Sequence, residues 1–466
     1  MRYVSTRGAA PALGFEDVVL AGLARDGGLY VPESWPAVDA ATLERWAGLS
    51  YAELAVEVMA PFVGDMPRDD FAAIVHAAYG VPDVFHSAAV TPLRQLDVNE
   101  WLLELFHGPT LAFKDVALQL LGRLFGDILG RRDQRITVVG ATSGDTGSAA
   151  IEACRDRDNV TIFMLHPAGR VSEVQRRQMT TVPSENVVNI AVEGTFDDCQ
   201  ALVKAMFNDH AFRDRHRLGA VNSINWARVL AQVVYYFHAA LSLGAHDGRR
   251  IDFSVPTGNF GDVFAGYVAA RMGLPVGKLV VATNINDILS RALRSGDYSR
   301  GTVQPTMSPS MDIQVSSNFE RLLFDLYGRD GDRVRALMDD FAAGGTLAIG
   351  NRQVADASRL FAAARVDEDE TSATIAAVLR ANATLIDPHT AVGVAAGRRL
   401  RTAESVPLVA LATAHPAKFP DAVEAASGIR PALPPHLADL MERPERYEIL
   451  PNDLKSVQDY IAARTA

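Results

Sequence analysis

The sequence has very little cysteine, with only Cys154 and Cys199 in 466 residues. Two thiols cannot build a disulfide framework or a cysteine-rich zinc site. No stretch approaches the ~18 consecutive apolar residues that a membrane span requires, and no apolar run follows the charged N-terminus as it does in a secretory signal. We therefore expect a cytoplasmic protein that has no metal site and does not contact a membrane.

Positive charge is also scarce. The formal net charge is −11, and no segment is rich in Lys and Arg. This balance disfavours nucleic acid and anionic membranes as partners, because both bind through basic surfaces. If the chain binds an anionic small molecule, it must do so with a few local donors rather than with its overall field.

Lysine is the rarer of the two basic residues, with five occurrences at positions 114, 204, 278, 418 and 455. Arg replaces it almost everywhere on the surface, yet only a lysine amine can form a Schiff base with an aldehyde, because the guanidinium group stays protonated. Lys114 follows Ala112 and Phe113 and begins an amphipathic pattern. It is therefore a candidate nucleophile. A lysine that snorkels at the start of a helix would explain the same pattern.

A chain of 466 residues is too long for one ordinary core, so we expect two or three domains. From about residue 130, short β-branched runs alternate with helical patterns, which indicates an α/β fold with parallel sheets covered on both faces. Such sheets bind ligands at the loops that follow the strands. The expected strands are Ile136–Val139, Val160–Leu165, Val187–Val192, Ile251–Val255, Leu279–Thr283 and Val406–Leu411.

The two ends of the chain differ from this pattern. Residues 1–90 are mostly helical and punctuated by proline, which predicts a separate N-terminal domain. Residues 91–430 would form the core, with a smaller lobe at roughly 131–235, and residues 431–466 would form a C-terminal appendage.

Two expected strands run into loops that are suited to anions. Residues 141–147 carry three hydroxyls and free amides at a helix N-terminus, which can receive a carboxylate or a phosphate. Residues 256–262 contain glycines that allow the backbone to approach an anion closely. Helix capping alone would explain either loop. Neither matches the dinucleotide fingerprint or the P-loop.

Two further segments carry polar groups of interest. In residues 222–228, a helix starting near Asn225 would place Arg228 one turn from Asn225, and Arg suits planar recognition of phosphate. An exposed Arg on an amphipathic helix is the alternative. In residues 412–419, which follow a strand, His415 is better explained as a structural hydrogen-bonding group than as a catalytic base.

Together, these segments resemble the threonine synthase family of pyridoxal-phosphate enzymes, in its longer form with an N-terminal domain. The similarity runs through the whole chain in order and is specific in combination. The matching motifs are MRYVSTRG (1–8), GLARDGGLYVP (22–32), HGPTLAFKD (107–115), TSGDTGSA (142–149), NSINWAR (222–228), PTGNFGD (256–262), SSNFERLLF (316–324), DPHTAVG (387–393) and ATAHPAKF (412–419).

The resemblance implies a fold and a set of cofactor-binding residues. The fold would be that of fold-type II enzymes, similar to the tryptophan synthase β subunit, with two parallel-sheet lobes and a mainly helical N-terminal domain. Lys114 would form the Schiff base with the cofactor, and Thr413 would face the pyridine nitrogen. A hydroxyl at that position leaves the nitrogen largely unprotonated and weakens the ring as an electron sink. The cofactor phosphate would be held by Gly258, Asn259, Phe260, Gly261 and Asp262.

The resemblance also implies the substrate-binding residues and the reaction. Thr142, Ser143 and Thr146 would bind the substrate carboxylate, and Asn222, Ser223 and Arg228 the substrate phosphate. The enzyme would be a carbon–oxygen lyase acting on phosphate, which converts O-phospho-L-homoserine and water to L-threonine and phosphate. A phospho-lyase that releases 2-oxobutyrate and an inactive cofactor-binding homologue are the alternatives.

Two points stay open at this stage. Asp145 stands where many fold-type II enzymes have Asn, and an ionised carboxylate there would repel the phenolic oxygen of the cofactor. Asp145 is therefore either protonated or directed elsewhere. The oligomeric state, monomer or homodimer, is not determined by these motifs.

Overall fold

The computed structural model describes residues 1–64, 66–219, 221 and 223–465. The chain forms two compact units, each assembled from separate stretches of sequence. The first unit contains Met1–Val18, Leu23–Phe113 and Ser223–Pro431, and the second contains Val19–Gly22, Lys114–Asn222 and Ala432–Ala466.

The first unit is built on a sheet with the strand order β13-β10-β9-β14-β4-β3. All neighbours are parallel except β3 and β4, which form an antiparallel pair at one edge. The buried strands are short apolar runs, as expected for a sheet covered on both faces. The strands are β3 (Leu93–Asp97), β4 (Glu100–Glu104), β9 (Ile251–Pro256), β10 (Val276–Thr283), β13 (Phe361–Arg365) and β14 (Leu408–Ala412).

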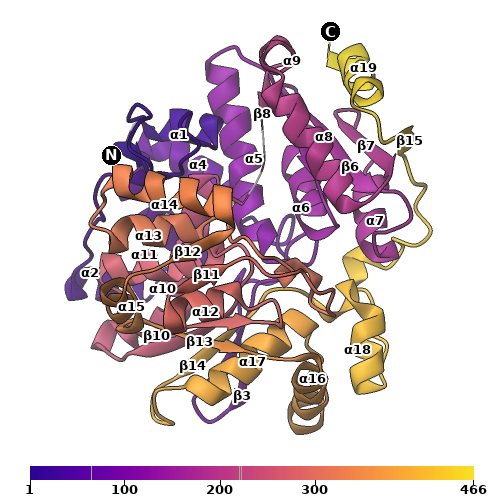
Figure 1. Ribbon diagram of the computed structural model, residues 1–466. Helices are drawn as coiled ribbons and strands as arrows, with labels where there is room; N and C mark the ends of the chain where they lie inside the picture. The colour runs from indigo at the N-terminus through magenta and orange to yellow at the C-terminus, as the bar shows by residue number, and fades with distance from the viewer. Residues whose placement is uncertain (65, 220, 222, 466) are drawn as a thin grey trace. The chain divides into compact units, whose positions relative to one another are not determined.

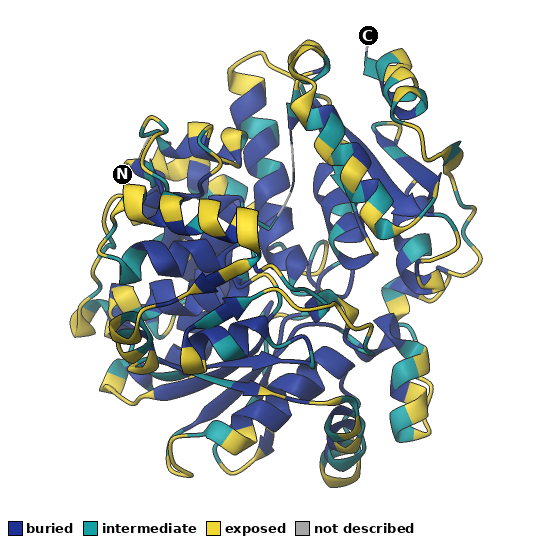
Figure 2. Cartoon of the chain, in the orientation of Figure 1, coloured by how far each residue is buried: buried dark blue, intermediate teal, exposed yellow. Residues whose placement is uncertain are grey.

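Helices cover both faces of this sheet. Figure 1 shows α16 (Glu368–Asn382) and α17 (Pro388–Leu400) on one side of the strands and α11 (Gly261–Met272) and α13 (Phe319–Leu326) on the other. The central strands β9 and β14 take the buried colour in Figure 2, whereas the outward face of α14 (Gly331–Gly344) is exposed. The remaining helices of this part are α10 (Trp226–Ser242), α12 (Ile288–Ser295), α15 (Asn351–Ser358) and α18 (Pro420–Ser427).

The N-terminal residues of the first unit are mostly helical. They form α1 (Phe15–Ala21), which continues into the second unit, and α2 (Ala40–Trp46), α3 (Tyr51–Val63) and α4 (Arg68–Ala78). Ser50 and Glu53 form a capping box at the start of α3, and α3 packs against α10. Two small antiparallel pairs complete this unit, β1 (Tyr3–Ser5) with β2 (Tyr30–Pro32) and β11 (Asp297–Ser299) with β12 (Thr346–Ala348).

The second unit contains a parallel sheet with the order β15-β7-β6-β5-β8. Its apolar face packs against α8 and α19, and its other face lies against α6, which in turn packs on α5 and α7. The strands are β5 (Ile136–Ala141), β6 (Val160–Pro167), β7 (Val187–Glu193), β8 (Leu218–Gly219) and β15 (Glu448–Pro451). The helices are α5 (Lys114–Arg131), α6 (Asp145–Cys154), α7 (Glu173–Thr180), α8 (Phe196–Asn208), α9 (His210–Arg215) and α19 (Leu454–Thr465).

These arrangements confirm the α/β fold with two parallel-sheet lobes and a mainly helical N-terminal region. The residues that we interpreted as a C-terminal appendage contribute an edge strand, β15, and the covering helix α19 to the second sheet. No helix within the described part of the chain is both long enough and apolar enough to cross a membrane.

Candidate active site

Lys114 is the first residue of α5 in the second unit, and it is buried. Its Nζ lies 3.2 Å from Oδ2 of Asp145, the first residue of α6. The other carboxylate oxygen of Asp145 accepts a hydrogen bond of 2.8 Å from Nε2 of Gln175. Asp145 is therefore turned toward the lysine amine.

The loop between β5 and α6 owes its shape to local hydrogen bonds. Oγ1 of Thr142 accepts the N–H groups of Gly144 and Gly147, each at 2.9 Å. Gly144 has a φ of 143°, which strongly favours glycine. Thr142 is buried, Thr146 is half-buried and Ser143 is exposed. These three hydroxyls, which we predicted to bind a carboxylate, thus lie together at the N-terminus of α6 in the second unit.

The residues before Lys114 are tied to the segment after β14 within the first unit. The N–H of Phe113 donates to the carbonyl of Thr413 at 2.8 Å, and the N–H of His415 donates to the carbonyl of Leu111 at 3.0 Å. Nζ of Lys418, which is fully buried, donates to the carbonyl of Thr110 at 2.7 Å. The chain thus fixes the residue that precedes Lys114 against Thr413.

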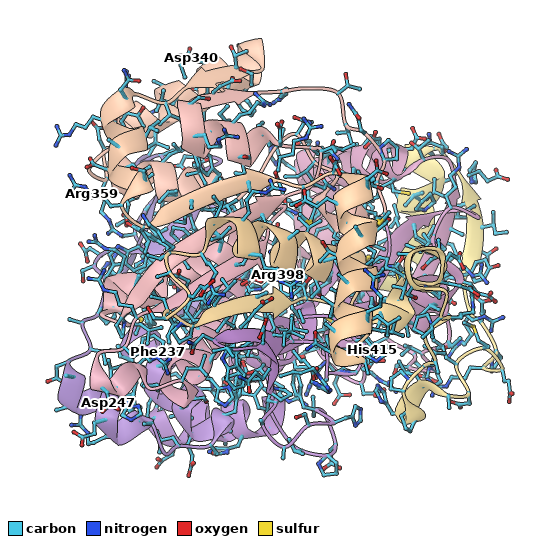
Figure 3. All side chains as sticks on the ribbon, turned by 90° about the horizontal axis from the view of Figure 1, so that it is seen from below. Phe237, Asp247, Asp340, Arg359, Arg398 and His415 are labelled. Carbon is cyan, nitrogen blue, oxygen red and sulfur yellow. The ribbon has the colours of Figure 1, made fainter. Side chains whose placement is uncertain are left out.

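His415, labelled in Figure 3, has a structural role in this segment. Its Nδ1 accepts the N–H of Ala417 at 3.1 Å. Burial lowers the pKa of His415 to about 4, helped by the nearby charge of His107. A ring this reluctant to take a proton is a poor general base at neutral pH.

The loop at residues 256–262 joins β9 to α11 in the first unit. Phe260 has a φ of 63°, which is strained for a bulky residue, and its ring packs 5.2 Å from that of Phe319. A Cβ on Gly258 would come within 2.6 Å of the carbonyl oxygen of Ser310, so only glycine fits there. Gly261 begins α11, so its amide belongs to the free N–H groups of a helix N-terminus.

The carboxylate of Asp262 binds two tyrosine hydroxyls and does not offer a donor to an anion. Its Oδ1 accepts hydrogen bonds from the hydroxyls of Tyr235, at 2.5 Å, and Tyr236, at 2.9 Å. Burial and the adjacent Asp262 carboxylate raise the pKa of both phenols well above their ordinary value, so they remain donors. Asp262 can serve an anion only through its backbone.

Arg228 lies on α10, whose N-terminus is capped by the side chain of Asn225. Its guanidinium is buried, and among the described residues Nε and Nη1 have no hydrogen-bond partner. Burial lowers the pKa of Arg228 to about 10, so the group remains charged at neutral pH. A buried cation with free donors is a strong indication of an anion site.

The remaining predicted phosphate ligands are only partly described. Ser223 is half-buried, and its hydroxyl lies 3.2 Å from that of Ser317. Asn222, the third residue of the predicted group, lies outside the described residues. Within the first unit, residues 316–321 donate hydrogen bonds to both the 223–228 segment and the 256–262 loop. The sequence suggested no role for these residues.

The sequence did not predict a role for two further buried side chains of these segments, Gln175 and Lys418. Gln175 was missed because its partner Asp145 is far away in sequence and no motif contains both. Lys418 belonged to a recognised motif, but its burial could not be read from the motif. Within the described part of the chain, no cluster of His, Cys, Asp or Glu is arranged to hold a metal ion.

These residues fit an anionic aldehyde cofactor. In the second unit, a buried lysine beside a carboxylate could form a Schiff base with an aldehyde. In the first unit, a helix N-terminus with a close-approach glycine could bind an anion, and so could an arginine with two nitrogens that lack a partner among the described residues.

Comparisons with known proteins agree along the chain. Residues 2–79 match the family described as threonine synthase N terminus, residues 84–358 the pyridoxal-phosphate dependent enzymes, and residues 390–461 the threonine synthase C-terminal family. The threonine synthase of Pseudomonas aeruginosa is 60% identical, over 99% of this chain and 98% of its own. That of Corynebacterium glutamicum is 46% identical, over 99% and 98%.

Solved structures give the same result. The PLP-bound threonine synthase of Brucella melitensis superposes with a TM-score of 0.97 at 56% identity, covering 100% of this chain and 99% of its own. Yeast threonine synthase superposes with a TM-score of 0.94 at 43% identity, covering 99% and 98%. The chain therefore belongs to the threonine synthase family of pyridoxal-phosphate-dependent enzymes of fold type II.

Proposed function

We propose that this chain converts O-phospho-L-homoserine and water to L-threonine and inorganic phosphate. The observation that carries the proposal is Arg228, a buried guanidinium with two nitrogens that lack a partner among the described residues. Such a group costs folding free energy unless an anion completes it. The paired Lys114 and Asp145 support the same reaction, because the chemistry needs an amine held in a buried site.

Lys114 has two roles in this proposal. Its amine holds the cofactor covalently and, once the substrate amine has replaced it, moves protons at Cα and Cβ of the substrate. When bound, pyridoxal phosphate supplies the electron sink that makes these carbon-bound protons removable. The carboxylate of Asp145 accepts a hydrogen bond from the amine at 3.2 Å and so orients Lys114.

The other residues bind and orient. We propose that residues 258–262 hold the cofactor phosphate through backbone N–H groups, and that Thr413 faces the ring nitrogen. Thr142, Ser143 and Thr146 would bind the substrate carboxylate at the N-terminus of α6. Asn222, Ser223 and Arg228 would bind the substrate phosphate and retain it after its bond to carbon breaks, so that it can accept a proton from the attacking water.

Three further expectations concern the location, the oligomeric state and the domain boundaries of the protein. We infer a cytoplasmic location, a monomeric or homodimeric state, and domain boundaries near residues 90 and 430. None of the reaction steps above depends on them.

The test is an end-point assay with O-phospho-L-homoserine that measures phosphate, threonine and 2-oxobutyrate together. We expect one threonine for each phosphate released. Phosphate matched by 2-oxobutyrate would make the protein a phospho-lyase that uses the same lysine. No release of phosphate would contradict the substrate assignment.

A further inference from the structure

Residues 316–321 supply hydrogen-bond donors to the turn that begins the 256–262 loop. Oγ of Ser316 donates to the carbonyl of Gly258 at 2.8 Å. The N–H and the side-chain Nδ2 of Asn318 both donate to the carbonyl of Asn259, at 3.0 and 2.9 Å. Oγ of Ser317 donates to the side-chain oxygen of Asn259 at 3.2 Å. These acceptors of Gly258 and Asn259 are thus all bound by one short segment.

The same segment also donates hydrogen bonds to the carbonyls of residues 223 and 224. Nδ2 of Asn318 also donates to the carbonyl of Ser223 at 3.1 Å. Nη2 of Arg321 donates to the carbonyl of Ile224 at 2.6 Å. A single side-chain amide, that of Asn318, therefore joins the carbonyls of Ser223 and Asn259.

Arg321 fixes the orientation of that amide. Its Nη1 donates to Oδ1 of Asn318, which directs the NH₂ group of Asn318 toward the two carbonyls. Arg321 and Asn318 are both fully buried. Arg321 also donates from Nε and Nη2 to the carbonyl of Tyr30 on β2, at 3.1 and 3.0 Å. The arrangement is therefore held by the N-terminal region.

The physical consequence concerns the polarity of the two segments. A loop binds an anion well only if N–H and O–H donors face the anion and carbonyl oxygens do not. Ser316, Asn318 and Arg321 bind backbone carbonyls of the two segments and so keep these oxygens directed toward residues 316–321. The N–H and O–H donors of the two segments then stay available for a ligand. Because the Oδ1 of Asn259 accepts from Ser317, the NH₂ group of Asn259 is also left to donate.

We propose that Asn318, oriented by Arg321, is a positioning residue that joins the two anion-binding segments, so that affinity for both phosphate groups depends on this one amide. Ser316 serves the 256–262 loop alone. Ser317 touches both segments through Asn259 and Ser223. This inference rests on the proposed function for the identity of the two anions.

The test compares five variants with the wild-type protein, of which one is a control. Asn318→Asp keeps the shape and the contact with Arg321 but replaces two donors by an oxygen that faces two carbonyls. Ser316→Ala removes the donor to Gly258 only. Ser317→Ala removes the hydroxyl of a half-buried side chain, and Ser317→Thr restores it. Asn351→Asp, on the exposed first residue of α15, is the matched control.

Three quantities are measured for each variant: the Kd of inorganic phosphate for the cofactor-free protein by calorimetry, the Kd of pyridoxal phosphate, and the KM for O-phospho-L-homoserine at saturating cofactor. We expect Asn318→Asp to weaken all three by on the order of tenfold, because buried carbonyls lose their partners. Ser316→Ala should weaken cofactor binding alone. Ser317→Ala should weaken both affinities by roughly threefold, and Ser317→Thr should restore them.

The outcomes separate this inference from the proposed function. Affinities of Asn318→Asp within twofold of wild type would overturn it, as would equal losses in Asn351→Asp. If Asn318→Asp does not fold, wild-type affinities in Ser317→Ala and Ser316→Ala would overturn it instead. A wild-type protein that binds phosphate but leaves O-phospho-L-homoserine unchanged would contradict the proposed function, while the phosphate titrations would still decide the role of Asn318.

Discussion

At the scale of single residues, the chain buries several cations in unusual surroundings. Lys114 faces a carboxylate, Lys418 and Arg321 donate to backbone carbonyls, and Arg228 keeps two nitrogens without a partner among the described residues. Burial of a charge is expensive unless hydrogen bonds compensate it. Hydrogen bonds to backbone carbonyls compensate the burial of Lys418 and Arg321, whereas an anionic ligand would be needed to compensate the burial of Arg228.

Replacing Lys114 by Arg should abolish cofactor attachment without unfolding the protein. Arginine preserves the positive charge beside Asp145 but cannot form a Schiff base. We expect loss of the visible absorbance of the bound cofactor and loss of activity, with an unchanged melting temperature. Lys455→Arg, at a lysine that is 79% exposed, is the control. Retention of the absorbance in Lys114→Arg would contradict the assignment.

Replacing Arg228 by Met should stabilise the protein and weaken phosphate binding at the same time. The change removes a buried charge at similar volume, which is expected to raise the free energy of unfolding by about 1–3 kcal/mol. The inhibition constant for inorganic phosphate should rise at least tenfold. Arg294→Met, on an exposed position of α12, should change neither quantity. A destabilised variant with normal phosphate inhibition would show that Arg228 is structural.

The sequence revealed some of these residues and not others, for a physical reason. Lys114, Arg228 and residues 258–262 stand out because rarity, helix starts and glycine-rich loops are local signals. Gln175 and Asn318 do not, because their importance comes from partners that folding brings close. Asp262 shows the limit of a motif, since its position in the loop did not reveal that two tyrosines bind its carboxylate.

At the scale of secondary-structure elements, close helix packing depends on single glycines. A Cβ on Gly122 of α5 would come within 2.0 Å of the carbonyl oxygen of Ala153 on α6. One on Gly126, a turn later, would make only an ordinary contact at 3.5 Å with Arg157. The two helices can therefore approach closely only where Gly122 lies.

Gly122→Ala should accordingly destabilise the second unit by about 2 kcal/mol or more, because α5 and α6 must move apart. Gly126→Ala should be neutral or stabilise it by roughly 0.5–1 kcal/mol, since alanine favours the helix. Urea unfolding followed by circular dichroism measures both. Equal effects of the two changes would show that the helices tolerate the added methyl group.

His238 lies on α10 where this helix packs against α3, and its burial there is expected to make the stability of the protein depend on pH. Nδ1 of His238 lies 3.1 Å from Oγ1 of Thr91, and its ring lies 5.3 Å from that of Tyr51. Burial lowers the pKa of His238 from 6.5 to about 4. The ring is thus neutral in the folded protein at a pH where the unfolded chain would be protonated.

His238 should therefore contribute fully to stability above pH ~6.5, and this contribution should fall as the pH drops toward ~4, by about 1–3 kcal/mol. In His238→Gln, the free energy of unfolding should vary less over this range. His76→Gln, at an exposed position of α4, is the control. Identical pH dependence in wild type and His238→Gln would contradict this role.

Periodicity predicted the β-branched strands and several helices well, and it missed elements that depend on tertiary contacts. Strand β13 has the sequence FAAAR, whose three alanines do not favour a strand, and it forms by pairing with β10. The antiparallel β3–β4 pair and the short strand β15 were missed for the same reason. Helix α6 begins at Asp145, within the loop predicted at residues 141–147, where Oγ1 of Thr142 accepts the N–H groups of Gly144 and Gly147.

At the scale of the whole molecule, the two units interleave along the chain, so sequence order does not reveal their membership. The boundaries near residues 90 and 430 stay predictions. The second unit depends on α19, because Val457 and Ile461 are fully buried in the same cluster as Phe163 and Ile190.

Ile461→Ala should therefore cost about 2–5 kcal/mol and act on the second unit alone. Hydrogen exchange should become faster in β6 and β7 but not in β9 and β10, because the two sheets belong to different units. Lys455→Ala, on the exposed face of α19, should leave both unchanged. Faster exchange in both sheets would mean that the units unfold together.

The position of β15 also has a consequence for how the protein is made. Strand β7 pairs with residues 448–451, which a ribosome adds only after all of residues 223–431. Until then β7 has no partner on that side, and α8 lacks its contact with α19. A chain that stops before residues 448–451 would therefore expose the free edge of β7 and be prone to aggregate.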